Sequence, residues 1–216
     1  MTPCVKEPFN GFSHLGGALL SLAGLAVLVT LAAMRATPWH VVSFSVYGSS
    51  MVLLYTASAL YHLLPLSEKG TRIFKTADHM MIYFLIAGTY TPFCLVPLRG
   101  AWGWSIFGVV WGLALAGMAL KLLWLDAPRW LSTTLYLGLG WICLVAIYPL
   151  LQAMPLGGLL WLLAGGVAYS LGALIYATKK PDPWPGVFGF HEIFHVFVLA
   201  GSFCHFWVMV RYLIRL

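Results

Sequence analysis

Seven apolar stretches run from one end of the chain to the other, with only short breaks between them. An α-helix needs about 20 consecutive apolar residues to cross the hydrocarbon core of a bilayer, and these stretches have that length. The breaks are polar or rich in Pro and Gly, which commonly mark helix ends. The predicted membrane spans are Ser13–Met34, His40–Leu64, Thr76–Val96, Ala101–Leu120, Leu131–Leu150, Leu156–Tyr176 and Phe190–Val210.

The composition excludes an ordinary soluble protein. Hydrophobic residues make up 61% of the chain and charged residues only 8%, whereas a soluble domain carries about 25% charged residues. The breaks between the apolar stretches are too short to hold a soluble domain. We therefore expect one domain over residues 1–216: an all-α membrane protein, built as a seven-transmembrane helix bundle that crosses the cell membrane several times.

The basic residues indicate how this bundle is oriented. The net charge is +6, but the basic side chains gather at span ends, so they do not indicate nucleic-acid binding. Cytoplasmic loops of membrane proteins carry an excess of Lys and Arg. Eight such residues lie on the amino-terminal side, namely Lys6, Lys69, Arg72, Lys75, Lys121, Arg129, Lys179 and Lys180. The other side has four, namely Arg35, Arg99, Arg211 and Arg215. The sequence thus predicts a cytoplasmic amino terminus and a carboxyl terminus outside.

Two helix starts are predicted from local signals. Pro8 and Gly11 argue against a helix at the start of the chain, and Ser13 is a suitable cap for the first span. His14 would then lie in the first turn at the membrane face, where we expect it to bond headgroups or backbone. The segment 67–72 is expected to be a solvated turn, with Asp78 in the opening turn of the third span near the positive end of the helix dipole.

The last span opens with two histidines at helical spacing. His191 and His195 lie four residues apart, so both imidazoles can reach one metal ion from the same helix face. The surrounding segment is apolar, and ionisable groups inside a membrane are costly and usually functional. Glu192 completes the His-Glu-x-x-His pattern of a zinc-hydrolase helix. We interpret the pair as metal ligands rather than as two hydrogen-bonded core histidines.

The predicted topology brings further polar residues to the same membrane face. Even-numbered spans end where odd-numbered spans begin, so Ser58 and His62 meet Asp78 and the pair in span seven. Three imidazoles with an open position form the ligand set of a catalytic Zn²⁺ site. Asp78 could hold and deprotonate a water there, and Ser58 could bond a developing oxyanion. A buried site of three histidines could equally serve to tie three helices together.

Other candidate ligands are set apart by distance or spacing. His205 lies 14 residues beyond His191, which is about 21 Å along a helix, near the opposite membrane face. The four cysteines, Cys4, Cys94, Cys143 and Cys204, show no Cys-x-x-Cys spacing. They predict neither a disulfide framework nor a cysteine-based zinc site.

Taken together, these motifs resemble those of the bacterial haemolysin III proteins. This group belongs with the progestin and adipoQ receptor family, which includes the adiponectin receptors, and more distantly with the alkaline ceramidases. The resemblance spans all seven predicted helices, and it rests on five segments: Ser58-x-x-x-His62, Asp78-His79, Ala87-Gly88-Thr89-Tyr90-Thr91-Pro92-Phe93, His191-Glu192-Ile193-Phe194-His195 and Gly201-Ser202-x-x-His205.

The resemblance implies a particular zinc site and orientation. Zinc would be bound by His62, His191 and His195, with Asp78 holding its water and Ser58 beside it, which makes the last two the candidate catalytic residues. An amino terminus inside the cell is implied as well. The soluble amino-terminal extension of the eukaryotic receptors has no counterpart in this sequence, so a hormone-receptor role is not expected.

Four functions remain open at this point. The first is a zinc hydrolase of a membrane-lipid amide or ester, and the second is a non-enzymatic sensor or regulator of lipid state or stress with structural zinc. A cytolysin is disfavoured, because an integral seven-span protein would be a poor secreted toxin. An intramembrane metalloprotease would use Glu192 as its base and a distant Asp as third ligand. The convergence of His62 and Asp78 at the same face favours the functions that the family resemblance implies over an intramembrane metalloprotease.

Overall fold

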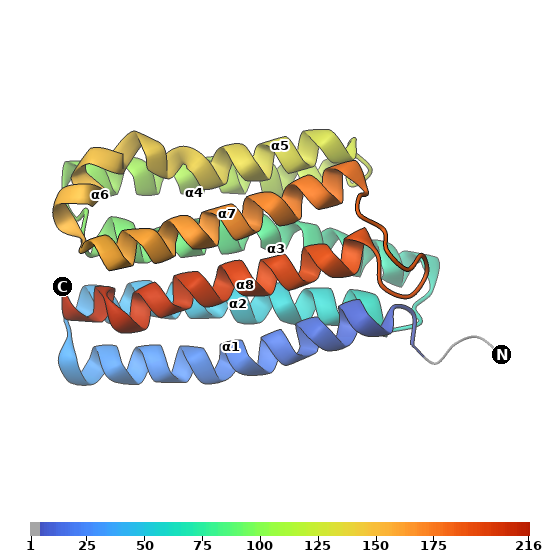
Figure 1. The fold of residues 1–216 in the computed structure, drawn as a ribbon, viewed down its shortest axis with the longest axis horizontal. Coiled ribbons are helices and arrows are strands. Elements are labelled where there is room, and N and C mark those ends of the chain that lie inside the picture. The colour runs from blue at the N-terminus through green and yellow to red at the C-terminus, as the bar shows by residue number, and fades with distance from the viewer. Residues whose placement is uncertain (1–4) are drawn as a thin grey trace.

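The computed structural model describes residues 5–216, which form a bundle of long helices lying side by side (Figure 1). A 3₁₀ segment, Trp141–Ala146, joins α5 to α6, so these three elements cross the bundle together. The chain therefore crosses the bundle seven times, as predicted. The α-helices are α1 (Pro8–Arg35), α2 (Pro38–Leu63), α3 (Glu68–Leu95), α4 (Ala101–Leu123), α5 (Arg129–Gly140), α6 (Ile147–Ala153), α7 (Leu156–Thr178) and α8 (Phe190–Arg211).

Most of these crossings have a lipid-compatible surface. Within the described residues, six helical crossings are long and apolar enough to span a membrane, and α3 is the exception. From Ala87 to Leu95 every residue of α3 is buried, and the helix packs between α2 and α4. Because protein rather than lipid surrounds this last third of α3, it can carry Thr and Tyr side chains that a lipid-facing helix would avoid.

Two predicted helix starts are wrong, and both helices begin earlier. Helix α1 begins at Pro8 rather than Ser13, because proline suits the first helical position, where its missing N–H bonds nothing anyway. Helix α3 begins at Glu68, and the Ser67 hydroxyl caps it by accepting a hydrogen bond from the Gly70 N–H at 3.3 Å. Asp78 therefore lies in the third turn of α3, away from the dipole end that we expected it to occupy.

The fifth crossing is interrupted in its middle. Pro149 lacks the N–H that would continue an α-helical ladder back into the preceding turn, and that turn is a 3₁₀ helix. Tyr90 of α3 supports the break: its hydroxyl donates to the Gly140 carbonyl at 2.6 Å and accepts from the Cys143 N–H at 2.8 Å. A side chain from another helix thus replaces part of the local ladder.

Tyrosine hydroxyls hold α8 in register with its neighbours. The Tyr55 hydroxyl on α2 donates to Oγ of Ser202 on α8 at 2.6 Å, and the Tyr169 hydroxyl on α7 lies 2.8 Å from the same oxygen. Tyr47 donates to the Ser202 carbonyl at 3.2 Å. These bonds link α8 to both α2 and α7.

One end of the bundle collects the elements that matter for function. The starts of α1, α3 and α8 lie together with the ends of α2 and α7, opposite the carboxyl terminus (Figure 1). Hereafter this is called the site end. The segment from 179 to 189, which links α7 to α8, also lies there.

Candidate metal centre

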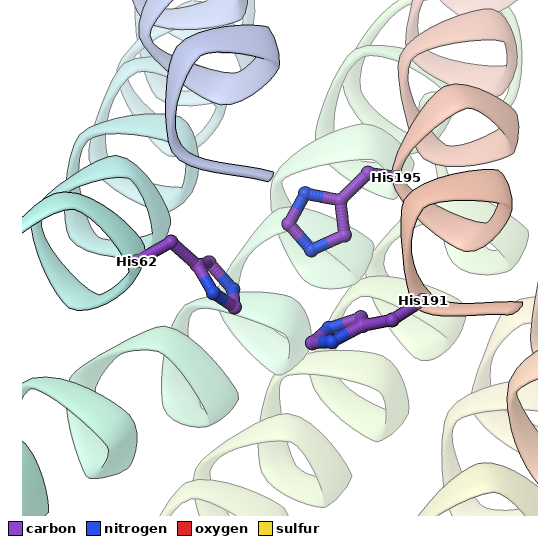
Figure 2. A group of neighbouring side chains, drawn as sticks. All are labelled: His62, His191 and His195. Carbon is purple, nitrogen blue, oxygen red and sulfur yellow. The ribbon is translucent and has the colours of Figure 1, made fainter. Parts of the chain in front are cut away.

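Three histidines from two helices converge at the site end. His62 lies in the last turn of α2, whereas His191 and His195 lie in the first two turns of α8. One ring nitrogen from each lies within 4.8 Å of the other two, and their rings point into a shared space (Figure 2). The ring centroids form a nearly regular triangle, with sides of 5.1, 4.9 and 4.9 Å. The sequence prediction that these three residues meet agrees with this geometry.

The triangle suits a metal ion by spacing and by chemistry. A tetrahedral zinc ion with bonds of about 2.0–2.1 Å holds its ligand nitrogens about 3.3 Å apart, so a modest inward movement of the rings completes the site. His62 and His195 are 0% and 2% exposed, and Nε2 of His62 has no hydrogen-bond partner among residues 5–216. A buried nitrogen without a partner is costly, and a bound cation would supply that partner.

Glu7 orients the first of these ligands. Its Oε2 accepts a hydrogen bond from Nδ1 of His62 at 2.6 Å, which leaves Nε2 of the same ring free to bind a metal. A carboxylate on the far nitrogen of a ligating histidine fixes the ring and raises its basicity. The hydrogen bond from His62 lowers the pKa of Glu7 to about 2, so this side chain is a carboxylate at neutral pH.

Asn10 and Glu192 form a second layer beside the triangle. The Asn10 amide donates to Oε1 of Glu192 at 2.8 Å and to Oε2 of Glu7 at 3.3 Å. The other oxygen of Glu192 accepts from the Gly189 N–H at 2.8 Å, which caps the start of α8. Glu192 is therefore engaged in capping and bridging, although the His-Glu-x-x-His pattern suggested a catalytic base.

The sequence patterns did not predict Glu7 and Asn10 as parts of the site, and the predicted position of His14 was wrong. Glu7 had a usable signal, because it is one of only six acidic residues in the chain. His14 is not at the membrane face: it is 3% exposed, and its ring stacks on His195 with centroids 3.7 Å apart. Neither nitrogen of His14 has a hydrogen-bond partner within residues 5–216.

The two candidate catalytic residues lie outside the triangle, on α2 and α3. Ser58 lies one turn before His62 and is 1% exposed. The Asp78 side chain is 13% exposed, and its Oδ2 lies 3.7 Å from Nδ1 of the neighbouring His79. In the part of the chain that the structure describes, Asp78 is not among the groups whose ligand atoms cluster with the three histidines. Their roles stay predictions.

The remaining candidate ligands lie elsewhere. His205 is buried on α8, where its ring packs against Tyr169 with centroids 5.4 Å apart, so it does not join the triangle. Nε2 of His40 lies 3.1 Å from the Leu213 carbonyl, at the opposite end of the bundle. Cys94, Cys143 and Cys204 are free thiols, and Cys4 lies outside the described residues.

These features define a class: an integral membrane protein of seven helical crossings with a cluster of three histidines, two of them fully buried, at one end. Within that class, the family model for haemolysin-III related proteins matches residues 2–206. The chain belongs to this family, as the motifs predicted. The bacterial relatives below place it in the cell membrane as a multi-pass protein.

Individual relatives agree over nearly the whole chain. It is 39% identical over 211 residues to the hemolysin-3 homolog of Bacillus subtilis, covering 97% of this chain and 95% of that protein. It is 40% identical over 215 residues to hemolysin-3 of Bacillus cereus, covering 99% and 95%. The adiponectin receptor protein of Drosophila melanogaster is 25% identical over 218 residues, which cover 93% of this chain and 49% of the receptor.

Proposed function

We propose that this protein binds one zinc ion through His62, His191 and His195 and hydrolyses an amide or ester bond of a membrane lipid. The observation that carries the proposal is the triangle of imidazoles, in which Nε2 of the buried His62 lacks a hydrogen-bond partner among the described residues. Three protein ligands leave one position open, as in catalytic rather than structural zinc sites. When bound in such a site, zinc acts as a Lewis acid and lowers the pKa of water to about 7.

The protein's own side chains supply the remaining chemistry. In this proposal the Asp78 carboxylate orients the attacking water and accepts its proton, a role that contributes typically 10²–10⁴-fold to the rate. Ser58 donates a hydrogen bond to the oxyanion that develops on the lipid carbonyl. Glu7 holds the His62 ring in place through its 2.6 Å hydrogen bond.

The depth of the site supports a lipid substrate. All three histidines lie within about two turns of the helix ends, which places them near the boundary between hydrocarbon core and headgroups. Amide and ester bonds of membrane lipids lie at that boundary. The first two turns of α1 bury Asn10 and His14 on their inner face. Their outer face borders an apolar groove lined by Pro8, Phe9, Phe12 and Val187. In this proposal the groove holds part of an acyl chain at the outer surface of α1.

A non-enzymatic sensor or regulator of membrane-lipid state with structural zinc is the second candidate. It is favoured by the near-complete burial of His62 and His195 and by the position of Asp78 outside the triangle. The metalloprotease alternative is weakened, because both oxygens of Glu192 already accept hydrogen bonds from Asn10 and Gly189.

The test begins with metal content and ends with catalysis. Purified protein should contain about one zinc per chain, and the metal should fall steeply in His191→Ala and His195→Ala. His40→Ala and His205→Ala are matched controls that should keep it.

Detergent-solubilised protein is then incubated with ceramide and ester-linked lipids before and after chelation. Metal-dependent release of a fatty acid is the expected result. Full metal retention after losing both His191 and His195 overturns the site, and hydrolysis that survives complete metal removal overturns the mechanism.

A further inference from the structure

A short segment at the start of α1 contacts both of the helices that carry the histidines. This segment, Glu7 to Asn10, is called the strap below. The Glu7 N–H donates to the carbonyl of His62 at 2.9 Å, and its carboxylate accepts from the His62 ring. Phe9 packs edge-on against Phe188, with ring centroids 5.0 Å apart. The strap thus contacts the end of α2 and the residues just before α8.

Asn10 is the residue that joins these two contacts. Its Nδ2 lies 3.3 Å from Oε2 of Glu7 and 2.8 Å from Oε1 of Glu192. A side-chain amide nitrogen has two hydrogens, whereas an ionised carboxylate can only accept. Each carboxylate therefore receives one hydrogen from the same amide. Asn10 is 1% exposed, so water does not compete for these bonds.

Each bridged carboxylate controls one side of the triangle. Glu7 fixes the ring of His62 on α2, and Glu192 caps the turn of α8 that carries His191. Without the amide, the two carboxylates would lie near one another with no shared donor between them, and like charges at short range repel. Aspartate at this position would add a third negative group, and leucine would remove the donor that the two carboxylates share, leaving Glu7 with His62 and Glu192 with Gly189.

We propose that Asn10 is a positioning residue of the metal centre. Its amide holds Glu7 and Glu192 in their places, and through them it sets the spacing between His62 and His191 before a metal arrives. This inference rests on the zinc binding proposed above. It assigns to the strap a function in metal affinity, beyond the packing of α1.

The experiment compares metal affinity in detergent for the full chain and four variants. These are Asn10→Leu, Asn10→Asp, the exchange variant Asn10→Asp with Glu192→Gln, and the control Ser13→Ala. The Ser13 hydroxyl bonds the Asn10 carbonyl at 3.0 Å and does not touch the carboxylates. Zinc affinity is measured by competition with a chromophoric chelator, and ligand geometry by the visible spectrum of bound Co²⁺. Helical content and thermal unfolding are recorded with the metal removed.

We expect Asn10→Leu and Asn10→Asp to bind zinc about 10–100-fold more weakly, as disruption of groups behind the ligands commonly does. Their Co²⁺ spectra should also change. The exchange variant restores an amide next to a carboxylate, so it should recover most of the affinity that Asn10→Asp loses. Ser13→Ala should match the parent.

The outcomes separate this inference from the function on which it rests. A parent protein that binds no zinc overturns both proposals. A parent that binds zinc, with Asn10→Leu and Asn10→Asp within about twofold of it, overturns the role of Asn10 alone. If metal-free Asn10→Leu does not fold, the other pair decides the matter: an exchange variant no better than Asn10→Asp contradicts the bridge.

Discussion

Oε2 of Glu7 lies 2.6 Å from Nδ1 of His62, although the two residues are 55 positions apart in the chain. This contact makes the start of α1 part of the candidate metal centre. It also determines which nitrogen of His62 is available, because a ring nitrogen that donates to a carboxylate cannot bind a metal. The predictions below follow from this arrangement and from the bundle that holds it.

Glu7→Gln should weaken zinc binding while leaving the fold intact. Glutamine keeps an acceptor for Nδ1 of His62 but loses the negative charge that makes the imidazole a better ligand. We expect zinc affinity to fall about 10–100-fold, as measured by chelator competition. Glu68→Gln is the matched control, since Glu68 is exposed at the start of α3. Equal affinity in both variants would contradict the orienting role of Glu7.

The stacking of His14 on His195 gives a second prediction. His14→Phe keeps a ring against His195, whereas His14→Ala leaves a cavity beside it. We expect the alanine variant to unfold at lower temperature and to bind zinc more weakly, with the phenylalanine variant close to the parent in zinc affinity. Metal titration and thermal unfolding in detergent measure both effects. If phenylalanine is as harmful as alanine, the ring nitrogens of His14 matter rather than its stacking.

Tyr90→Phe tests the support of the broken fifth crossing. The change removes a hydroxyl that bonds both Gly140 and Cys143, and loss of a buried partner costs about 1–3 kcal/mol. We expect a lower thermal midpoint with unchanged zinc content. Tyr148→Phe serves as control, because Tyr148 is 68% exposed. A Tyr90→Phe protein as stable as the control would show that the break needs no support from α3.

The orientation in the membrane is a separate prediction. Reporter fusions within residues 69–72 and 179–185 should be cytoplasmic, and a fusion after Leu216 should lie outside. The excess of Lys and Arg on the amino-terminal side motivates this expectation. A cytoplasmic carboxyl terminus would reverse it and move the histidine cluster to the opposite membrane face.

Short-range signals predicted the seven crossings and the pair His191 and His195, whereas His62 was joined to that pair by the predicted topology and the family resemblance. Apolar length marks a span, and spacing of four residues places His191 and His195 on one face. Helix ends were less predictable, since hydropathy marks the hydrocarbon layer while α1 and α3 continue beyond it to Pro8 and Glu68.

Contacts between distant residues carried no local signal. The bonds from Asn10 to Glu192 and from Tyr90 to Gly140 depend on helix packing. Neither is visible in the spacing of residues along one helix. The position of His14 was predicted wrongly because α1 begins earlier than expected. His14 therefore lies in the second turn of the helix rather than the first, and it is buried there.

The measurement that tests the central claim most directly is the lipid hydrolysis and zinc content of Asp78→Asn. Asparagine keeps the size of the side chain but cannot accept the proton of an attacking water. If zinc serves catalysis, this variant should retain its zinc and fold while hydrolysis falls by about 10²–10⁴-fold. Asp126→Asn, a change at a surface carboxylate that is 69% exposed, should hydrolyse at the parent rate. An Asp78→Asn protein with full zinc and undiminished hydrolysis would contradict the account.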